Sequence, residues 1–193
     1  MFDIKKFFQT ELNEHAKVLS DSMQVLEEPF VELVELCFDC IKNNNKIMFV
    51  GNGGSAADAQ HLSAELTVRF SVNRQALAAI ALTTDTSAIT AIGNDLGFNK
   101  IFSRQVEALG SKGDVLIVIS TSGVSSNVIE AANQANLQGI NVASLTGATG
   151  GKLKSVSKTI LCVPSTKTAR IQEMHITLGQ MLCNALEYRL GLI

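Results

Sequence analysis

Residues 46–55 read KIMFVGNGGS, in which four apolar residues, Ile47–Val50, run directly into a glycine-rich turn. The apolar run carries no alternating polar residues, which is typical of a strand buried on both faces, as in a parallel sheet covered by helices. Four more short apolar runs of the same kind follow along the chain. They occupy residues 77–82, 115–119, 141–145 and 159–163. The sequence therefore predicts five buried strands.

Segments with helical periodicity separate these runs and predict the other layers of the fold. The expected helices span residues 56–69, 86–92, 101–109 and 126–137, with a long final helix near 168–190. Such alternation predicts an α/β fold, a three-layer doubly wound sandwich with a five-stranded parallel sheet. The chain has 193 residues and shows no internal repeat, linker or low-complexity segment, so we expect residues 1–193 to form a single domain.

The segment before the first strand has a different pattern. Apolar residues recur at steps of three and four over residues 4–28, which predicts an amphipathic helix. Pro29 suits the first turn of a second helix, and the polar run at 43–45 ends it. We expect these two helices to form an N-terminal helical hairpin over residues 1–44, as an extension of the domain.

The composition excludes several classes of protein. Hydrophobic residues make up 46% of the chain and charged residues 18%, which suffices for a core and is untypical of a disordered chain. The net charge of −2 argues against direct binding to nucleic acid. The longest unbroken apolar stretch, Ala76–Leu82, falls far short of the roughly 20 residues that span a membrane. The four cysteines lack zinc-finger spacing, so we expect them to be reduced thiols that pack in the core. These features together predict a cytoplasmic protein without membrane contact.

Two loops that follow predicted strands carry the chemistry of an anion site. Ligands of open α/β sheets bind beyond the carboxyl ends of the strands, where Gly51–Ser55 and Ser120–Asn127 both lie. The glycines of the first loop permit close backbone approach, and Ser55 can cap the next helix. The second loop carries five hydroxyls within seven residues, more than a helix cap needs. This favours a phosphate site. The alternative is that each loop only turns the chain and caps the next helix.

Two of the predicted helices carry further candidate residues. His61 and Glu65 lie one turn apart, a spacing that allows metal binding or acid–base work shared between imidazole and carboxylate. The alternative is a solvated polar face on which Arg69 simply pairs with Glu65. On the last helix, Gln172 and Gln180 lie beside the apolar stripe, where they matter only if this face closes a pocket.

These segments together resemble the phosphoheptose isomerases, which are sugar isomerase (SIS) domain proteins. The similarity covers essentially the whole chain, and its most specific part combines GNGGS (51–55), GND (93–95) and RIQE (170–173). Members of this family convert sedoheptulose 7-phosphate to D-glycero-D-manno-heptose 7-phosphate for lipopolysaccharide. The resemblance therefore implies a SIS fold, isomerase activity, and a homotetramer whose active sites lie between subunits.

The resemblance also implies roles for individual residues. Glu65 is the implied proton-transfer base, and position 180 holds its implied acid–base partner. One zinc ion per subunit is implied at His61, Glu65, Gln172 and Gln180. The implied substrate contacts are Asn52, Gly53, Gly54, Ser55, Glu65, Asn94, Asp95, Ser120, Thr121, Ser122, Ser125 and Gln172.

Position 180 is where this chain departs from the family, because it has Gln where the isomerases have His. An amide ligates a metal weakly through its oxygen and does not exchange protons near neutral pH. We therefore expect a weak or partly occupied zinc site. The alternative to an isomerase is a non-catalytic SIS tetramer that senses a sugar phosphate or binds the bacterial replication initiator, as a sister protein without this histidine does. The intact His61–Glu65 pair and the phosphate loop favour the isomerase.

Overall fold

The structure is a computed structural model that describes all 193 residues, and it is built on one five-stranded sheet. The strands are β1 (Ile47–Gly51), β2 (Ala79–Ala81), β3 (Val115–Ser120), β4 (Asn141–Gly147) and β5 (Thr159–Val163). They lie in the order β2-β1-β3-β4-β5, and all neighbouring pairs are parallel. Each predicted strand is confirmed. β2 is shorter than the expected 77–82 because it lies at the sheet edge and pairs only with Ile47–Phe49.

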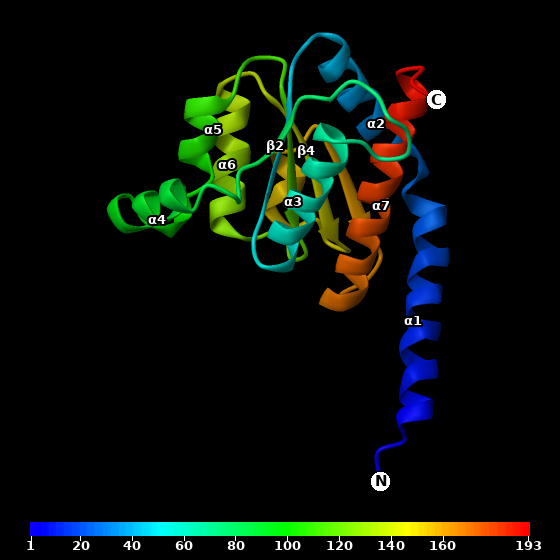
Figure 1. Cartoon of the computed structure of the whole chain (residues 1–193). Coiled ribbons are helices and arrows are strands. Elements are labelled where there is room, and N and C mark those ends of the chain that lie inside the picture. The colour runs from blue at the N-terminus through cyan, green and yellow to red at the C-terminus, as the bar shows by residue number, and fades with distance from the viewer.

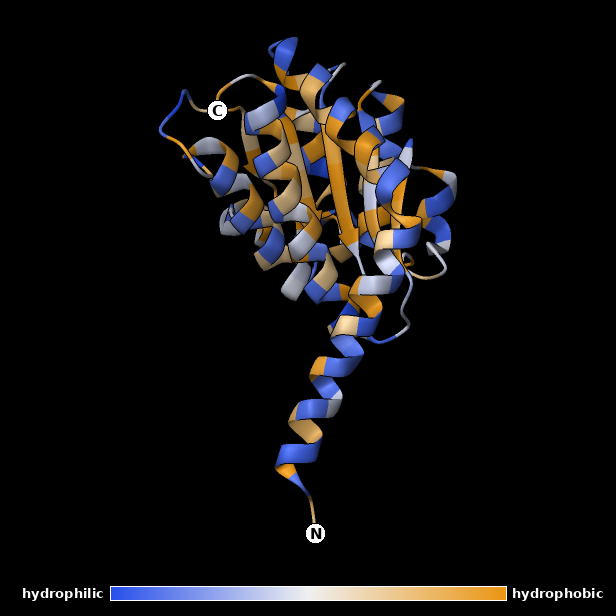
Figure 2. Ribbon diagram, turned by 90° about the vertical axis from the view of Figure 1, so that its right-hand side faces the viewer, coloured by the Kyte–Doolittle hydropathy of each residue, from blue (hydrophilic) through white to orange (hydrophobic).

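Helices cover both faces of the sheet (Figure 1). They are α2 (Glu27–Lys42), α3 (Gly54–Thr67), α4 (Thr86–Asp95), α5 (Ser103–Leu109), α6 (Ser126–Leu137) and α7 (Thr168–Arg189), with 3-10 turns at Phe98–Lys100 and Gly151–Ser155. Successive residues of a strand face opposite sides of the sheet. Ile47 and Phe49 pack with α2, α3 and α7, whereas Met48 and Val50 pack with α5 and α6. The predicted three-layer sandwich is confirmed, and Figure 2 shows its apolar strands between the helices.

Two helices precede the sheet as predicted, but they do not form the predicted hairpin. Only Leu26 separates α1 (Ile4–Val25) from α2, and its backbone is helical, with φ −107° and ψ −2°, so the chain bends there without reversing. As a result α1 projects beyond the body of the domain (Figures 1 and 2). Its apolar stripe, which includes Phe8, Leu12 and Met23, is exposed.

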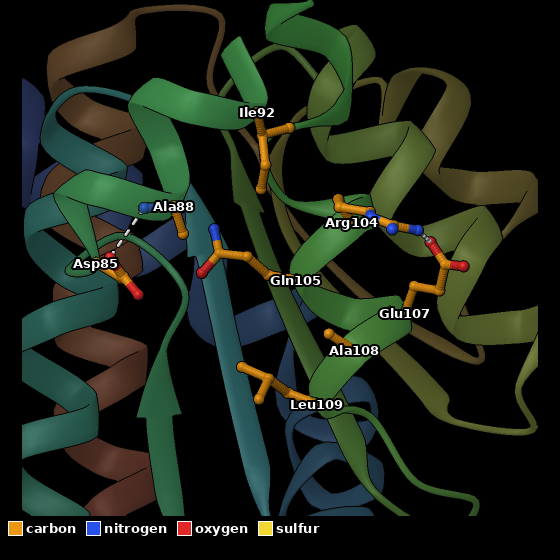
Figure 3. Close-up of a pocket in the computed structure, with 8 residues that line it drawn as sticks. All are labelled: Asp85, Ala88, Ile92, Arg104, Gln105, Glu107, Ala108 and Leu109. Carbon is orange, nitrogen blue, oxygen red and sulfur yellow. Dashed lines mark hydrogen bonds and ion pairs between the residues drawn. The ribbon is translucent and has the colours of Figure 1, made fainter. Parts of the chain in front are cut away.

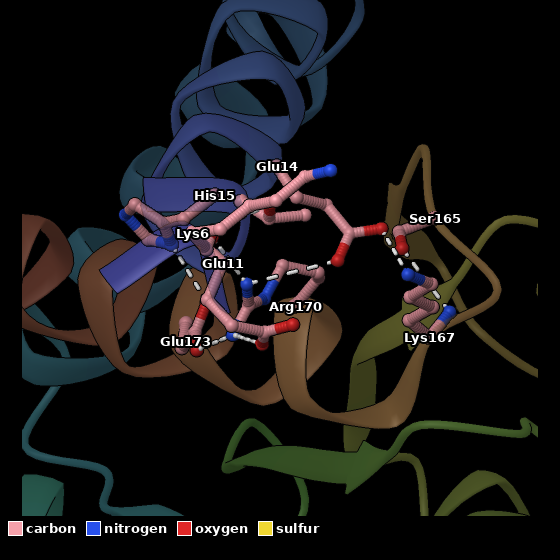
Figure 4. A network of polar contacts seen from close by, with 9 residues as sticks. Lys6, Glu11, Glu14, His15, Ser165, Lys167, Arg170 and Glu173 are labelled. Carbon is pink, nitrogen blue, oxygen red and sulfur yellow. Dashed lines mark hydrogen bonds and ion pairs between the residues drawn. The ribbon is translucent and has the colours of Figure 1, made fainter. Parts of the chain in front are cut away.

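A polar network fixes the middle of α1 against the start of α7 (Figure 4). The side chain of Arg170 is only 7% exposed; it donates to the backbone carbonyl of Glu11 at 2.6 Å and pairs with Glu173 at 2.6 Å. His15 lies 2.7 Å from the other carboxylate oxygen of Glu173. Arg170 and Glu173 of the RIQE segment therefore position α1, while Gln172 between them is left for another role.

The cysteines are packing residues, as predicted. All four are free, and Cys37, Cys40 and Cys183 are buried while Cys162 is half-buried. Burial raises the pKa of the Cys40 and Cys183 thiols to about 12, which keeps them as unreactive thiols near neutral pH. Among the helices, none combines the length and the apolar character needed to cross a membrane.

Candidate active site

The strand order places the two candidate loops beside each other. In a sheet of order 2-1-3-4-5, the ligand crevice lies where β1 and β3 are neighbours and their connections diverge. The glycine loop (Gly51–Ser55) follows β1, and the serine loop (Ser120–Ser125) follows β3. Gly51 pairs with Ile119 in the sheet, so the two loops begin at adjacent positions of its carboxyl edge. The sequence prediction that function lies at this edge thus corresponds to one place in the fold.

A reciprocal amide pair joins the two loops. The Asn52 side chain donates to the Asn127 carbonyl oxygen at 2.9 Å, and Asn127 donates back to Asn52 at 2.9 Å. Asn127 lies in the first turn of α6 and is only 2% exposed. Sequence reasoning did not single out Asn127, because an asparagine near a helix start is ordinarily explained by local capping.

The glycine loop leads into α3 two residues earlier than the sequence predicts. Gly53 is the N-cap residue, with φ 55° and ψ −121°, a backbone conformation that favours glycine. The expected capping role of Ser55 is therefore wrong: this residue lies within the first turn of α3 and is buried. A Cβ atom on Gly54 would lie 2.8 Å from Nε2 of Gln172, so the missing side chain lets Gln172 of α7 approach the loop.

The hydroxyls of the serine loop face one another rather than capping α6. Ser125 is the N-cap residue of α6, yet its side chain makes no capping bond. Its hydroxyl instead lies 3.2 Å from that of Ser120, which also accepts from Gly123 N–H at 3.2 Å. Ser122 accepts from the backbone of Val124 at 3.3 Å. The first N–H groups of α6 thus lack a side-chain cap, and an uncapped helix N-terminus beside hydroxyls favours an anion.

The candidate acid–base residues lie on α3 and face α7. Nε2 of His61 lies 3.0 Å from Oε1 of Glu65 and 2.8 Å from Nε2 of Gln180. The alternative pairing of Glu65 with Arg69 is not formed. A Cβ atom on Gly179 would lie 2.5 Å from Leu62 of α3, so this glycine allows the two helices to approach closely enough for Gln180 to reach His61.

A buried ion pair holds the other end of α3 and α7 together. The carboxylate of Glu187 is fully buried; it accepts from Nε of Arg74 at 2.7 Å and from the backbone N–H groups of Phe70 and Ser71 at 3.0 Å each. Burial alone would raise the pKa of Glu187, but these donors outweigh it and hold the pKa below its usual range. The Arg74 guanidinium also donates to the backbone carbonyl of Glu65 at 3.0 Å.

His175 does not replace the missing histidine at position 180. It is fully buried, and its Nε2–H donates to the backbone carbonyl of Thr146, at the end of β4, over 3.2 Å. Burial lowers the pKa of His175 to about 4, so its ring is neutral near physiological pH. His175 therefore holds the first half of α7 to the carboxyl end of β4, whereas Gln180 makes the contact with His61.

Two of the implied substrate contacts lie apart from the others. Asn94 and Asp95 end α4 and are exposed, and Asn94 donates to Asp95 at 2.8 Å. Neither makes a hydrogen bond to the two loops or to α3 and α7. The structure thus links the glycine loop to the serine loop and to Gln172, and links His61 to Glu65 and Gln180 further along α3. The GND segment ends α4, which lies away from α3 and α7 (Figure 1).

A cavity of about 460 Å³ lies between α4 and α5 (Figure 3). None of its lining residues is a predicted site residue, and the charged groups around it already have partners. Asp85 accepts from the backbone of Ala88 at 2.9 Å, and Arg104 pairs with Glu107 at 2.6 Å. The cavity therefore offers no free charged group to a ligand, and the candidate active site remains the β1–β3 crevice.

The side chains around His61 fit a metal ion only as weak ligands. His61, Glu65 and Gln180 converge within hydrogen-bond distance, and turning the Gln180 amide would present its oxygen. No group of three or more His, Cys, Asp or Glu side chains is arranged to hold a metal ion. The donor set contains one imidazole and one carboxylate, with neutral amides in place of the further strong ligands that zinc prefers.

Comparisons with known proteins show the family and the fold. The sequence model of the SIS domain matches residues 12–147. A phosphoheptose isomerase of Paramagnetospirillum magneticum is 51% identical over 94% of each chain. The solved phosphoheptose isomerase GmhA of Neisseria gonorrhoeae is similar with a TM-score of 0.92 and 46% identity, covering 96% of this chain and 100% of that one. That of Francisella tularensis has a TM-score of 0.93 and 34% identity over 97% and 100%. The chain belongs to the SIS domain family and, within it, to the phosphoheptose isomerases.

Proposed function

We propose that this protein is an aldose–ketose isomerase that converts sedoheptulose 7-phosphate to D-glycero-D-manno-heptose 7-phosphate. The observation that carries the proposal is that the glycine loop, which begins the helix carrying His61 and Glu65, is joined through Asn52 and Asn127 to the uncapped, hydroxyl-rich serine loop. Relatives at about half identity named phosphoheptose isomerase support the same activity. They favour it over the alternative of a non-catalytic tetramer that binds the replication initiator.

The chemistry divides between the two parts of the crevice. Ser120, Ser122 and Ser125 hold the phosphate together with the N-terminus of α6. This anchoring places C1 and C2 of the sugar near Glu65, which moves a proton between them through an enediol. Donors of the glycine loop stabilise the charge that develops on the sugar oxygens.

Turnover tests the proposal directly. Purified protein is incubated with sedoheptulose 7-phosphate, and the aldose product is followed by NMR, with and without added zinc. We expect accumulation of the heptose 7-phosphate in at least one of the two conditions. Absence of product in both would reject isomerase activity and leave the non-catalytic alternative.

Replacing Ser120 and Ser122 together by Ala is expected to weaken sugar-phosphate binding by about 100-fold or more, because each hydrogen bond to a charged group contributes about 1.5–3 kcal/mol. Calorimetric titration measures the affinity. Ser111→Ala is the matched control, since Ser111 is an exposed hydroxyl before β3, at the opposite edge of the sheet. An unchanged affinity in the double variant would show that the loop only terminates a helix.

We further propose that His61 and Glu65, with the amide oxygens of Gln172 and Gln180, hold a zinc ion weakly. When bound, zinc would act as a Lewis acid that polarises the substrate carbonyl. The weakness follows from position 180, where a neutral amide replaces the imidazole that zinc prefers. The Gln180–His61 hydrogen bond supports this proposal, since metal binding must displace it.

Gln180→His is expected to raise zinc affinity at least about tenfold, the lower end of what even an outer ligand partner contributes to metal binding. The same change should raise the turnover rate, because imidazole can exchange a proton. Competition with a chromophoric chelator measures the zinc affinity independently of activity. Tyr188→His adds an exposed histidine two turns further along α7 and serves as the control. Equal zinc affinity in all three proteins would show that position 180 does not determine metal binding.

The assembly that we propose is a homotetramer with active sites between subunits. Its first support is the apolar stripe of α1, which is exposed along a helix that projects from the domain. Its second support is an apolar groove of about 240 Å³ between α1, α2 and α7. The groove is lined by Leu19, Met23, Leu26, Phe30, Val31, Met174, Leu178 and Met181 among others. Its third support is that Asn94 and Asp95 end α4, which lies away from α3 within one chain (Figure 1).

The compartment that we propose is the cytoplasm. Free thiols are typical of proteins in a reducing compartment, and all four cysteines here are free. A substrate made by sugar-phosphate metabolism is consistent with the same compartment.

A further inference from the structure

The two ligand loops are joined beyond the sheet by one pair of side chains. The β1–β3 pairing ends at Gly51 and Ile119, immediately before the loops begin. Past that point, the two hydrogen bonds between Asn52 and Asn127 are the only ones that connect the glycine loop with the serine loop and the first turn of α6. Beyond the sheet, this pair is therefore the one hydrogen-bonded link between the loops.

The pair is complementary in a way that few side chains can reproduce. Each amide donates one N–H and accepts at its oxygen, so two hydrogen bonds close a ring between two elements 75 residues apart in the chain. Asn127 is buried, and a buried amide without a partner is strongly unfavourable. Its partner Asn52 is half-buried, and one N–H and the oxygen of its amide are hydrogen-bonded to Asn127.

The position of this link matters because a sugar phosphate has to extend across both loops. Its phosphate is bound by the serine loop, while its reacting carbons lie near Glu65 on α3, the helix that the glycine loop begins. A small change in loop separation moves the reacting carbons relative to Glu65, and displacements near 1 Å lower rates by about 100-fold. We expect inorganic phosphate to occupy the serine loop alone, so that its binding does not depend on the separation of the loops.

We propose that Asn127 is a positioning residue of the substrate site, whose amide, paired with that of Asn52, sets the distance between the phosphate loop and the glycine loop. Asn52 then has two roles: it contacts the ligand, and it holds the glycine loop to the serine loop through Asn127. The inference rests on the proposed function, because it assumes that a sugar phosphate occupies both loops. It assigns to Asn127 no contact with the ligand.

The test compares two ligands in five proteins by calorimetric titration. The ligands are inorganic phosphate and a heptitol 7-phosphate, which lacks the carbonyl group and cannot be isomerised. The proteins are the wild type, Asn127→Ala, Asn52→Ala, the double variant, and Asn133→Ala. Asn133 is the matched control, because it is an exposed asparagine of the same helix α6 without a side-chain hydrogen bond. Thermal unfolding confirms that each variant is folded.

We expect each single variant of the pair to weaken binding of the heptitol phosphate at least about tenfold. Binding of inorganic phosphate should stay within about threefold of the wild type. The double variant should lose no more heptitol affinity than Asn52→Ala alone, because both changes break the same link and Asn52 also contacts the ligand. In turnover, kcat/KM for sedoheptulose 7-phosphate should fall in parallel with the heptitol affinity. Asn133→Ala should match the wild type throughout.

Three results would overturn the proposal: equal losses for both ligands, no loss for either, or losses that multiply in the double variant. Should Asn127→Ala fail to fold, Asn127→Ser carries the same comparison, because its shorter side chain keeps a polar group at the site but does not form both hydrogen bonds to Asn52. The outcome is separable from that of the isomerase proposal. If the wild type shows no turnover but the variants lose heptitol binding selectively, the positioning role is retained and the isomerase proposal is rejected. If the wild type turns over and the variants bind both ligands with unchanged affinity, the isomerase proposal is retained and the positioning role is rejected.

Discussion

Glu65→Gln is expected to lower turnover of sedoheptulose 7-phosphate by about 10²–10⁴-fold, the usual contribution of a positioned acid–base group. The amide keeps the size of the side chain and can still hydrogen-bond to His61, which lies 3.0 Å away. It does not accept a proton from carbon near neutral pH. Fold and phosphate binding should therefore be preserved while the rate falls. Steady-state kinetics with the purified variant measure the effect as a loss in kcat.

The control for this change is Glu130→Gln on α6, where the carboxylate pairs with Lys100 at the surface at 2.7 Å. This variant should retain wild-type kinetics. A Glu65→Gln protein that kept more than a tenth of the wild-type kcat would show that the proton is carried by another group.

Glu187→Ala is expected to lower the free energy of unfolding by about 3–5 kcal/mol, the usual effect of removing one partner of a buried ion pair. The change leaves the Arg74 guanidinium, which is 2% exposed, without its carboxylate. It also removes the acceptor of the Phe70 and Ser71 N–H groups. Denaturant unfolding at a single protein concentration measures the effect, since assembly makes stability depend on concentration.

The matched control is Glu35→Ala, which breaks a bidentate pair with Arg189 at 2.7 and 3.0 Å on the surface. Both members of that pair are about half exposed, so little change in stability is expected. Similar stability losses in Glu187→Ala and Glu35→Ala would contradict the role assigned to burial. The larger loss should be accompanied by a fall in turnover, because Arg74 and Glu187 hold α3 against α7, which carry His61 and Gln180.

The sequence predicts the layers of this fold well, because buried parallel strands and the helices between them leave strong local patterns. Helix 126–137 and strand 159–163 were predicted with the bounds that the structure gives. The arrangement of α1 was not predictable in the same way. Its apolar stripe indicates that something covers the helix, but a periodic pattern does not identify the partner.

Candidate residues within the two loops and on α3 could be proposed from the sequence because each lies in a short motif, and their roles stay predictions. Asn127, Gly179 and the Arg74–Glu187 pair were missed because their roles depend on partners far away in sequence; 113 residues separate Arg74 from Glu187. The helix-capping role expected for Ser55 was wrong because Gly53, with its positive φ, starts the helix earlier. Local motifs thus indicate a candidate site, whereas the contacts that position its residues come from the tertiary structure.

The most direct test of the account is the reaction of sedoheptulose 7-phosphate in D₂O, followed by NMR with the wild-type protein, with and without zinc. Proton transfer through an enediol lets the transferred proton exchange with solvent, so we expect heptose 7-phosphate that carries deuterium at C2. Glu65→Gln should reduce product formation and deuterium incorporation together. Neither product nor deuterium exchange into the ketose, in either metal condition, would contradict the assignment of this crevice as an isomerase active site.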